Sequence, residues 1–299
     1  MGLLPFTAGL EIEFSIPDSY YRNVEGTEFL RGAHYSGRTR VIPGCSRTWS
    51  LKTDATCGYE LVSPVLRTTE ELESDVKAVC TYLKNIRLAA TDRCGLHVHL
   101  GLPASEQSLT QIVNTWNRYE EAVFLLVPNH RKSGYHWCKK LHDLRGDILT
   151  GKGLHAWGSV HENRYHWLNL VSVYEHGTVE WRCMESSFDP SFILGWISFL
   201  SHMNKFILSK KKSYRGNSRS SSEVQLHNML VQSGCYGAKL QKMDEDDRRR
   251  AIDARNFVAN RYTYLTGKNL RKVIKELTPS KTRSGTRDSD PDMNPYGGS

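Results

Sequence analysis

Residues 8–16 read AGLEIEFSI, and their side chains alternate strictly between two kinds. Apolar residues occupy every second position and polar residues the positions between them: Leu10, Ile12 and Phe14 against Glu11, Glu13 and Ser15. Successive side chains of a β-strand point to opposite faces. The stretch therefore predicts a strand with one buried face and one face that carries two carboxylates.

The same alternation recurs further along the chain. Residues 94–101, CGLHVHLG, set His97 and His99 against three aliphatic side chains. Residues 48–66 predict two short strands around a turn at Cys57-Gly58, and residues 165–173 and 177–183 predict a hairpin around Gly177.

Three helices are predicted from apolar periodicity and capping residues: Thr68 with Glu71, Ser108 with Gln111, and Asp189 with Pro190 at the first helical position. A last helical region covers residues 223–277. Consecutive hairpins with one apolar face favour an antiparallel sheet with helices beside it, an α+β fold, over a doubly wound one.

Composition excludes several protein classes. The 299 residues are 39% hydrophobic and 24% charged, which is not the composition of a wholly disordered chain. No apolar run reaches the ~18 residues of a membrane span. The seven cysteines include no CxxC pair, and the N-terminus has no signal-peptide pattern, so we expect reduced thiols and a cytoplasmic protein. The net charge of +8 suits an acidic or phosphate-bearing partner.

The polar faces of the predicted strands share an unusual composition of acids, histidines and one arginine: Glu11, Glu13, Asp54, Glu60, His97, His99, Glu180 and Arg182. Residues two apart in a strand lie about 7 Å apart on one face, where paired carboxylates repel each other. A divalent cation is a common counter-charge, and a carboxylate-rich cluster favours Mg²⁺ or Mn²⁺ over Zn²⁺. Because Mg²⁺ usually completes its shell with water and substrate phosphate, the pattern indicates a metal–nucleotide site.

Each of these signals also has a purely structural explanation when taken alone. A Glu-x-Glu strand is most often a solvated face, and a Glu-x-Arg pair is most often a surface ion pair. The two histidines fit a satisfied pair equally well, and Asp54 fits an Asx turn. Their conjunction on three strands with fully apolar opposite faces favours a site.

Five segments, in this order, resemble motifs of the amidoligases of the carboxylate–amine ligase superfamily, which share their fold with glutamine synthetase: residues 9–14 (GLEIEF), 54–64, 94–101, 164–170 (RYHWLNL) and 177–182 (GTVEWR). With their intervening helices they span about residues 9–208. The resemblance implies a curved, mostly antiparallel sheet of about six strands, with helices on its convex face. It also implies one catalytic domain over 1–277. The segment 278–299 has no aliphatic residue except Met293, so we expect a disordered tail there.

The resemblance further implies ATP-dependent ligation with Mg²⁺ or Mn²⁺. A carboxylate attacks the γ-phosphate of ATP, and an amine then attacks the acyl phosphate to give an amide. The implied metal ligands are Glu11, Glu13, Glu60, His97 and Glu180. The implied catalytic and nucleotide-binding residues are Asp54, Arg164, Arg182, His97, His99 and Asn169.

The substrates do not follow from the resemblance, because segments 18–47, 128–163 and 209–222 match no family motif. The amine could be an amino acid, a peptide or a lysine side chain; neither a membrane nor a nucleic acid is expected as a partner. Two alternatives stay open. One is a zinc hydrolase using Cys94, His97 and His99, and the other is a nucleotide-binding protein without enzymatic activity.

Overall fold

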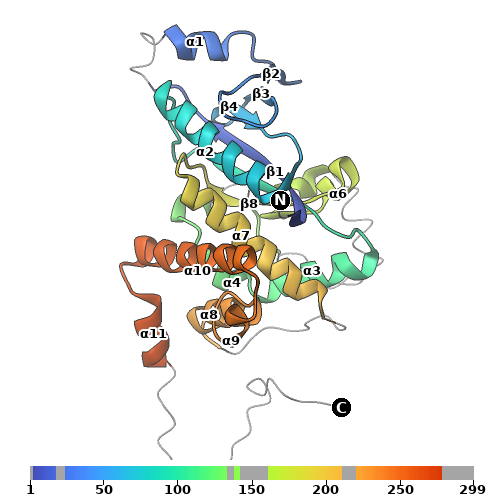
Figure 1. Ribbon diagram of the computed structural model, residues 1–299, viewed down its shortest axis with the longest axis vertical. Helices are drawn as coiled ribbons and strands as arrows, with labels where there is room; N and C mark the ends of the chain where they lie inside the picture. The colour runs from blue at the N-terminus through green and yellow to red at the C-terminus, as the bar shows by residue number, and fades with distance from the viewer. Residues whose placement is uncertain (1–2, 18–23, 133–137, 142–160, 211–219, 278–299) are drawn as a thin grey trace, which may run out of the picture.

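The computed structural model describes residues 3–17, 24–132, 138–141, 161–210 and 220–277 (Figure 1). Sequence predictions for residues 142–160, for the basic stretch 211–219 and for the tail 278–299 lie outside this part of the chain. Within it, no helix is both long and apolar enough to cross a membrane.

A single antiparallel sheet forms the centre of the described structure. Its eight strands run in the order β2-β3-β4-β1-β6-β8-β7, and β5 pairs with β1 beside this path. The strands are β1 (Leu3–Phe14), β2 (Arg38–Arg40), β3 (Trp49–Asp54), β4 (Gly58–Val62), β5 (Leu66–Thr68), β6 (Gly95–Gly101), β7 (Leu168–Asn169) and β8 (Val179–Glu185). The predicted α+β fold with a mostly antiparallel sheet is confirmed, with β2 and β5 as strands beyond those expected.

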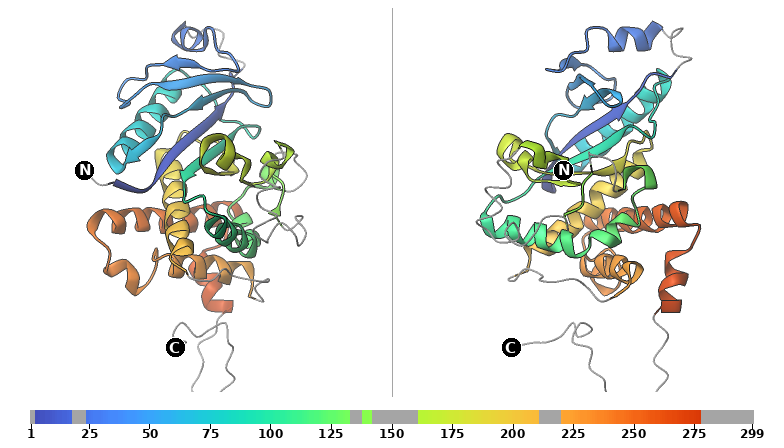
Figure 2. Two further views of the ribbon diagram at one scale, coloured as in Figure 1. Left: turned by 90° about the vertical axis from the view of Figure 1, so that its right-hand side faces the viewer. Right: turned by 180° about the vertical axis from the view of Figure 1, so that it is seen from behind.

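The helices gather mainly on one side of this sheet and below it (Figures 1 and 2). They are α1 (Val24–Leu30), α2 (Thr69–Asn85), α3 (Glu106–Arg118), α4 (Glu120–Phe124), α6 (Val171–His176), α7 (Pro190–Leu208), α8 (Ser222–Gln232), α9 (Ala238–Gln241), α10 (Glu245–Thr266) and α11 (Leu270–Leu277). Short 3-10 helices occupy Asn129–Arg131 (η2) and His161–Tyr165 (η4). Helices α2 and α7 contact β1, and α10 lies across α7.

The alternation in the sequence decides which face of the sheet is covered. Leu10 and Ile12 of β1 and Val98 of β6 are fully buried. Leu10 and Val98 are direct cross-strand partners, so their side chains share the helix-facing side. The acidic and histidine positions of the same strands must then point away from α2 and α7, and this places the charged residues together on the other face.

Two of the three predicted helix starts are confirmed as written. Thr68 and Glu71 form a capping box at α2, and Asp189 caps α7 with Pro190 at its first position. The third start was placed too late. Helix α3 begins at Glu106, because Ser105 accepts a hydrogen bond from the backbone N–H of Ser108 and so acts as the N-cap.

The predicted hairpin before β8 is wrong in part. Only Leu168–Asn169 is a strand, and the chain then turns into the short helix α6. Asn169 starts this turn by accepting a hydrogen bond from the Val171 N–H at 2.9 Å. Gly177, with φ +68°, ends α6 in the left-handed region rather than closing a two-stranded turn. In segment 18–47, expected to be a loop, the structure has helix α1 and edge strand β2.

The close approach of α7 and α10 depends on Gly195. A Cβ atom at this position would lie 2.6 Å from the Cβ of Phe257. We predict that Gly195→Ala destabilises the protein by about 1–3 kcal/mol, because overpacking outweighs the roughly 1 kcal/mol gain in helix propensity. Urea unfolding measures this change. Ser201→Ala in the same helix adds no volume and serves as the control; equal stability of the two variants would contradict the prediction.

Candidate functional site

The polar face of the sheet brings eight of the predicted site residues together from five adjacent strands: Glu11 and Glu13 (β1), Glu60 (β4), His97 and His99 (β6), Asn169 (β7), Glu180 and Arg182 (β8). Cross-strand register places them side by side. Glu13 lies opposite Glu60, Glu11 opposite His97, and Glu180 opposite both His99 and Asn169. Direct partners in an antiparallel sheet point to the same face, so the cluster follows from strand pairing alone.

His97 stands at the centre of the cluster. Its Nδ1 lies 2.8 Å from Glu11 Oε2 and 3.4 Å from Glu180 Oε1, while its Nε2 lies 3.4 Å from Glu13 Oε1. One imidazole thus links carboxylates from two strands. Glu13 is also held by the backbone N–H of Gly95, at 2.5 Å from Oε2.

Glu180 is held on both of its oxygens. Arg182 Nη1 donates to Oε1 at 2.7 Å, and Asn169 Nδ2 donates to Oε2 at 2.6 Å. Burial disfavours the charged carboxylate, but the Arg182 guanidinium and His99 outweigh this effect and lower the pKa of Glu180. The Glu180 side chain is therefore ionised and fixed in place at neutral pH.

A β-bulge places Arg182. Leu96 pairs with Met184 and Val98 with Trp181, so Arg182 and Cys183 both lie opposite the single residue His97. A bulge of this kind re-aims side chains next to a site. Burial disfavours the charged guanidinium, yet Glu180 and Glu11 raise the pKa of Arg182, and its positive charge lies within the acidic cluster.

His99 links the cluster to α6. Its Nδ1 is 2.9 Å from Thr178 Oγ1 and 3.1 Å from Ser172 Oγ, and its Nε2 faces Glu11 Oε1 at 3.4 Å. Burial acts against protonation, but Glu180 and Glu11 together raise the pKa of His99. Glu11, His99 and Glu180 each offer an atom within 4.8 Å of the others, an arrangement able to hold a metal ion.

The two remaining acidic side chains show that the face carries excess negative charge. Burial and then repulsion from Glu11 raise the pKa of Glu60 to about 9, against a smaller opposing effect of Lys52. Burial also acts to raise the pKa of Glu11, but the hydrogen bond with His97 and the nearby His99 imidazole hold it well below its usual value. At neutral pH Glu60 thus keeps a proton where a cation could stand.

The donor set fits a hard divalent cation. Carboxylate oxygens dominate it, and among the described residues Glu60 Oε1 and His99 Nε2 are buried atoms without a hydrogen-bond partner. A cation at this face would satisfy such atoms and offset the repulsion between the glutamates.

Asp54 ends β3 at the rim of the cluster. Its Oδ1 accepts hydrogen bonds from the N–H groups of Thr56 and Cys57, at 2.7 and 2.9 Å. Burial acts to raise its pKa, but these bonds and that from the Thr56 hydroxyl lower it overall. Asp54, Glu13 and Cys57 form a second group of potential ligands within 4.8 Å of one another. Asp54 therefore forms an Asx turn, and its carboxylate also lies close enough to Glu13 to share a metal ion with it.

The thiol of Cys94 does not join the two histidines. A hydrogen bond from Cys57 lowers the pKa of Cys94 to about 6, and Thr91 Oγ1 lies 3.2 Å from its sulfur. In the part of the chain that the structure describes, neither group of potential metal ligands combines Cys94 with His97 and His99. This geometry removes the reason for the zinc-hydrolase alternative.

Arg164 lies in η4, five residues before Asn169, with its guanidinium 5.9 Å from the centre of the Tyr165 ring. Its contact with phosphate stays a prediction.

Sequence reasoning missed Thr178, Ser172 and Lys52. Thr178 lies two residues before Glu180, and Lys52 two before Asp54, so strand parity alone could have placed both on the charged face. Lys52 is indeed the cross-strand partner of Glu60. Ser172 had no such signal, because it lies on α6, where a strand was expected.

Comparison with known proteins gives three findings. Residues 9–204 match the model of a family described as "Putative amidoligase enzyme". No curated protein matches the chain. Among solved structures, a chain of the crystal structure of the complex between the prokaryotic ubiquitin-like protein Pup and its ligase PafA is similar, with a TM-score of 0.48 and 10% identity, over 91% of this chain and 66% of that chain. The matched range agrees with the five motifs, and the chain belongs to this amidoligase family.

Proposed function

We propose that the protein is an ATP-dependent carboxylate–amine ligase that forms an amide or isopeptide bond through an acyl phosphate. Membership of the amidoligase family supports the reaction class. The observation that carries the proposal is the charged face itself, where His97 contacts Glu11, Glu13 and Glu180 and the positively charged Arg182 pairs with Glu180. Two anions must meet in this reaction, a carboxylate and a triphosphate, and only a face prepared to hold cations can bring them together.

Glu11, Glu13, Glu60, Glu180 and His97 would hold Mg²⁺, or Mn²⁺ in its place. Bound there, the metal supplies positive charge to the β- and γ-phosphates. The chain's own residues do the rest. Arg182, fixed by Glu180, presents a guanidinium to the transferred phosphoryl group, and Asn169 keeps the Glu180 carboxylate oriented.

The two steps balance without a further reactant. A substrate carboxylate oxygen bonds to the γ-phosphorus of ATP, and ADP leaves. The amine nitrogen then bonds to the acyl carbon, phosphate leaves, and the nitrogen gives up a proton. The lowered pKa of Asp54 suits a metal ligand better than a general base that would accept this proton.

The substrates are proposed by class only: a carboxylate, and an amine carried by an amino acid, a peptide or a protein side chain. All seven cysteines are free thiols: Cys45, Cys57, Cys80, Cys94, Cys138, Cys183 and Cys235. Free thiols fit a reducing compartment, so we propose that the reaction takes place in the cytoplasm.

Calorimetry with a non-hydrolysable ATP analogue tests the proposal directly. We expect binding that requires Mg²⁺, and we expect Glu180→Gln to abolish it. Loss of a residue that merely orients a metal ligand lowers metal affinity or activity by about 10–100-fold. Loss of the ligand Glu180 itself should therefore lower the Mg²⁺-dependent affinity for the analogue by more than about 100-fold.

The control for this test is Glu28→Gln, the same change at an exposed position in α1. Unchanged melting temperatures would show that both variants fold. Mg²⁺-independent binding, or equal affinity of Glu180→Gln and the unsubstituted protein, would rule out this site assignment. Where binding is seen, ADP release with mixtures of amines and carboxylates identifies the substrates.

Proton release provides a second test. The raised pKa of Glu60, about 9, means that its carboxyl group is protonated at pH 7.5, whereas a metal ligand must be ionised. We predict that Mg²⁺ binding releases about one proton and that Mg²⁺ affinity rises with pH up to about 9. Calorimetry in two buffers of different ionisation enthalpy counts the protons. Glu60→Gln should release none, and an unchanged count in that variant would contradict the assignment.

A further inference from the structure

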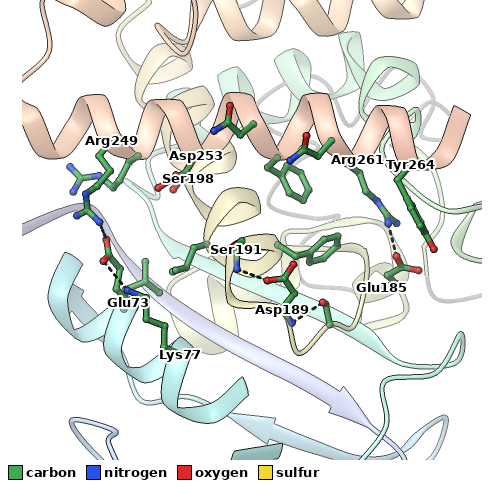
Figure 3. Close-up of a pocket in the computed structure, with 18 of the residues that line it drawn as sticks. Glu73, Lys77, Glu185, Asp189, Ser191, Ser198, Arg249, Asp253, Arg261 and Tyr264 are labelled. Carbon is green, nitrogen blue, oxygen red and sulfur yellow. Dashed lines mark hydrogen bonds and ion pairs between the residues drawn. The ribbon is translucent and has the colours of Figure 1, made fainter. Parts of the chain in front are cut away.

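A groove of about 820 Å³ lies among the helices. None of the eight residues gathered on the polar face of the sheet lines it. Helix α10 runs along one side, α2 lies on the other, and the segment joining β8 to α7 forms the floor between them (Figure 3). Ligand sites in proteins are commonly 300–1,000 Å³ in volume. The groove is therefore large enough for a ligand of its own.

The charged residues that line this groove are balanced in number. Four are basic and four are acidic: Lys77, Arg249, Arg250 and Arg261, and Glu73, Glu185, Asp189 and Asp253. Arg250 pairs with Asp247, which lies outside the lining. Arg249 pairs with Glu73, and Arg261 pairs with Glu185 at 2.6 Å (Figure 3). Asp189 is occupied by the N–H of Ser191. A groove balanced in this way has no preference for an anion or a cation and suits an uncharged polar ligand.

Two carboxamides on α10 are available to such a ligand. Asn256 and Asn260 are exposed and line the groove, and neither side-chain carboxamide has a hydrogen-bond partner within the described part of the chain. Four residues of helix span about 6 Å, and two residues of an extended chain span about 6.6 Å. Consecutive carboxamides on α10 therefore match alternate residues of an extended peptide. Each carboxamide offers a donor and an acceptor, as each peptide group does.

The floor of the groove and the facing side of α10 supply apolar contact and unsatisfied polar groups. Phe192 and Phe257 stack edge to face, with ring centroids 5.3 Å apart. Ser186 and Arg261 are 7% and 5% exposed, and Ser186 Oγ and Arg261 Nη2 lack a hydrogen-bond partner among the described residues. Buried donors without partners are costly, and a ligand carbonyl would satisfy the rotatable Ser186 hydroxyl.

From these contacts we infer that the groove between α2 and α10 binds an extended peptide segment with uncharged side chains. Asn256 and Asn260 pair with alternate backbone amides of the peptide, and one of its apolar side chains rests on Phe192 and Phe257. This inference goes beyond the proposed ligation, which takes place on the other face of the sheet.

The probe is a library of linear heptapeptides displayed on phage and selected on the full chain. The best sequence is then synthesised with blocked termini and a fluorophore, and its affinity is measured by fluorescence anisotropy. We expect enriched peptides without net charge. The double variant Asn256→Ala, Asn260→Ala should bind them about tenfold or more weakly.

Alanine is a better helix former than asparagine, so the double variant should keep its fold, and its melting temperature verifies this. Thr263→Ala, an exposed change on α10 outside the groove, is the matched control. Methylation of the peptide nitrogens at alternate positions should weaken binding to the unsubstituted protein in one register and not in the other.

Three results would overturn the inference: no peptide enriched over the double variant, equal affinity of the two proteins, or selection of charged peptides whose binding falls steeply with salt. Glu180→Gln separates this test from that of the ligase. Peptide binding should be unchanged in that variant whether or not ATP binding is lost.

Discussion

The charged face of the sheet is shaped by one constraint, the mutual repulsion of four carboxylates: Glu11, Glu13, Glu60 and Glu180. Four carboxylates on one face of the sheet cannot all be ionised without compensation. The protein meets this condition in three ways that the geometry makes explicit. His97 bridges strands, Arg182 neutralises Glu180, and Glu60 retains a proton. A bound cation would supply the same compensating positive charge. The repulsion that these three features offset is therefore also the property on which the proposed metal binding depends.

The helical side of the sheet supports this arrangement from behind. Trp181 lies between Glu180 and Arg182 in β8, and its ring packs edge to face on Trp116, with centroids 5.9 Å apart. Trp116 in turn donates to Asn204 Oδ1 of α7 at 3.1 Å. Trp167, just before β7, donates to the buried carboxylate of Glu120 at 2.7 Å. Rigid aromatic packing on one face thus fixes strands whose opposite faces must hold like charges close together.

Strand parity made much of this architecture predictable. The alternation in residues 8–16 and 94–101 was sufficient to separate Glu11, Glu13, His97 and His99 from the core, and capping residues located α2 and α7. Register was not predictable, because no local pattern says that Glu13 pairs with Glu60 or that a bulge lies opposite His97.

The helix α6 escaped prediction for a related reason. Its sequence alternates well enough for a strand, but the turn-forming hydrogen bond of Asn169 and the tertiary contact of Ser172 with His99 decide otherwise. The groove beside α10 was equally invisible, since it depends on how distant helices meet.

The central position of β1 has a consequence for how the chain folds. This strand pairs with β4, β5 and β6, and all three follow it in the sequence, the last by more than 80 residues. Pairings between distant segments require costly loop closure before they yield stabilising contacts, and such topologies fold slowly. During synthesis β1 therefore stays unpaired until β4, β5 and β6 have been made. In that interval its alternating carboxylates act as gatekeepers, since an edge bearing Glu11 and Glu13 repels a second copy of itself.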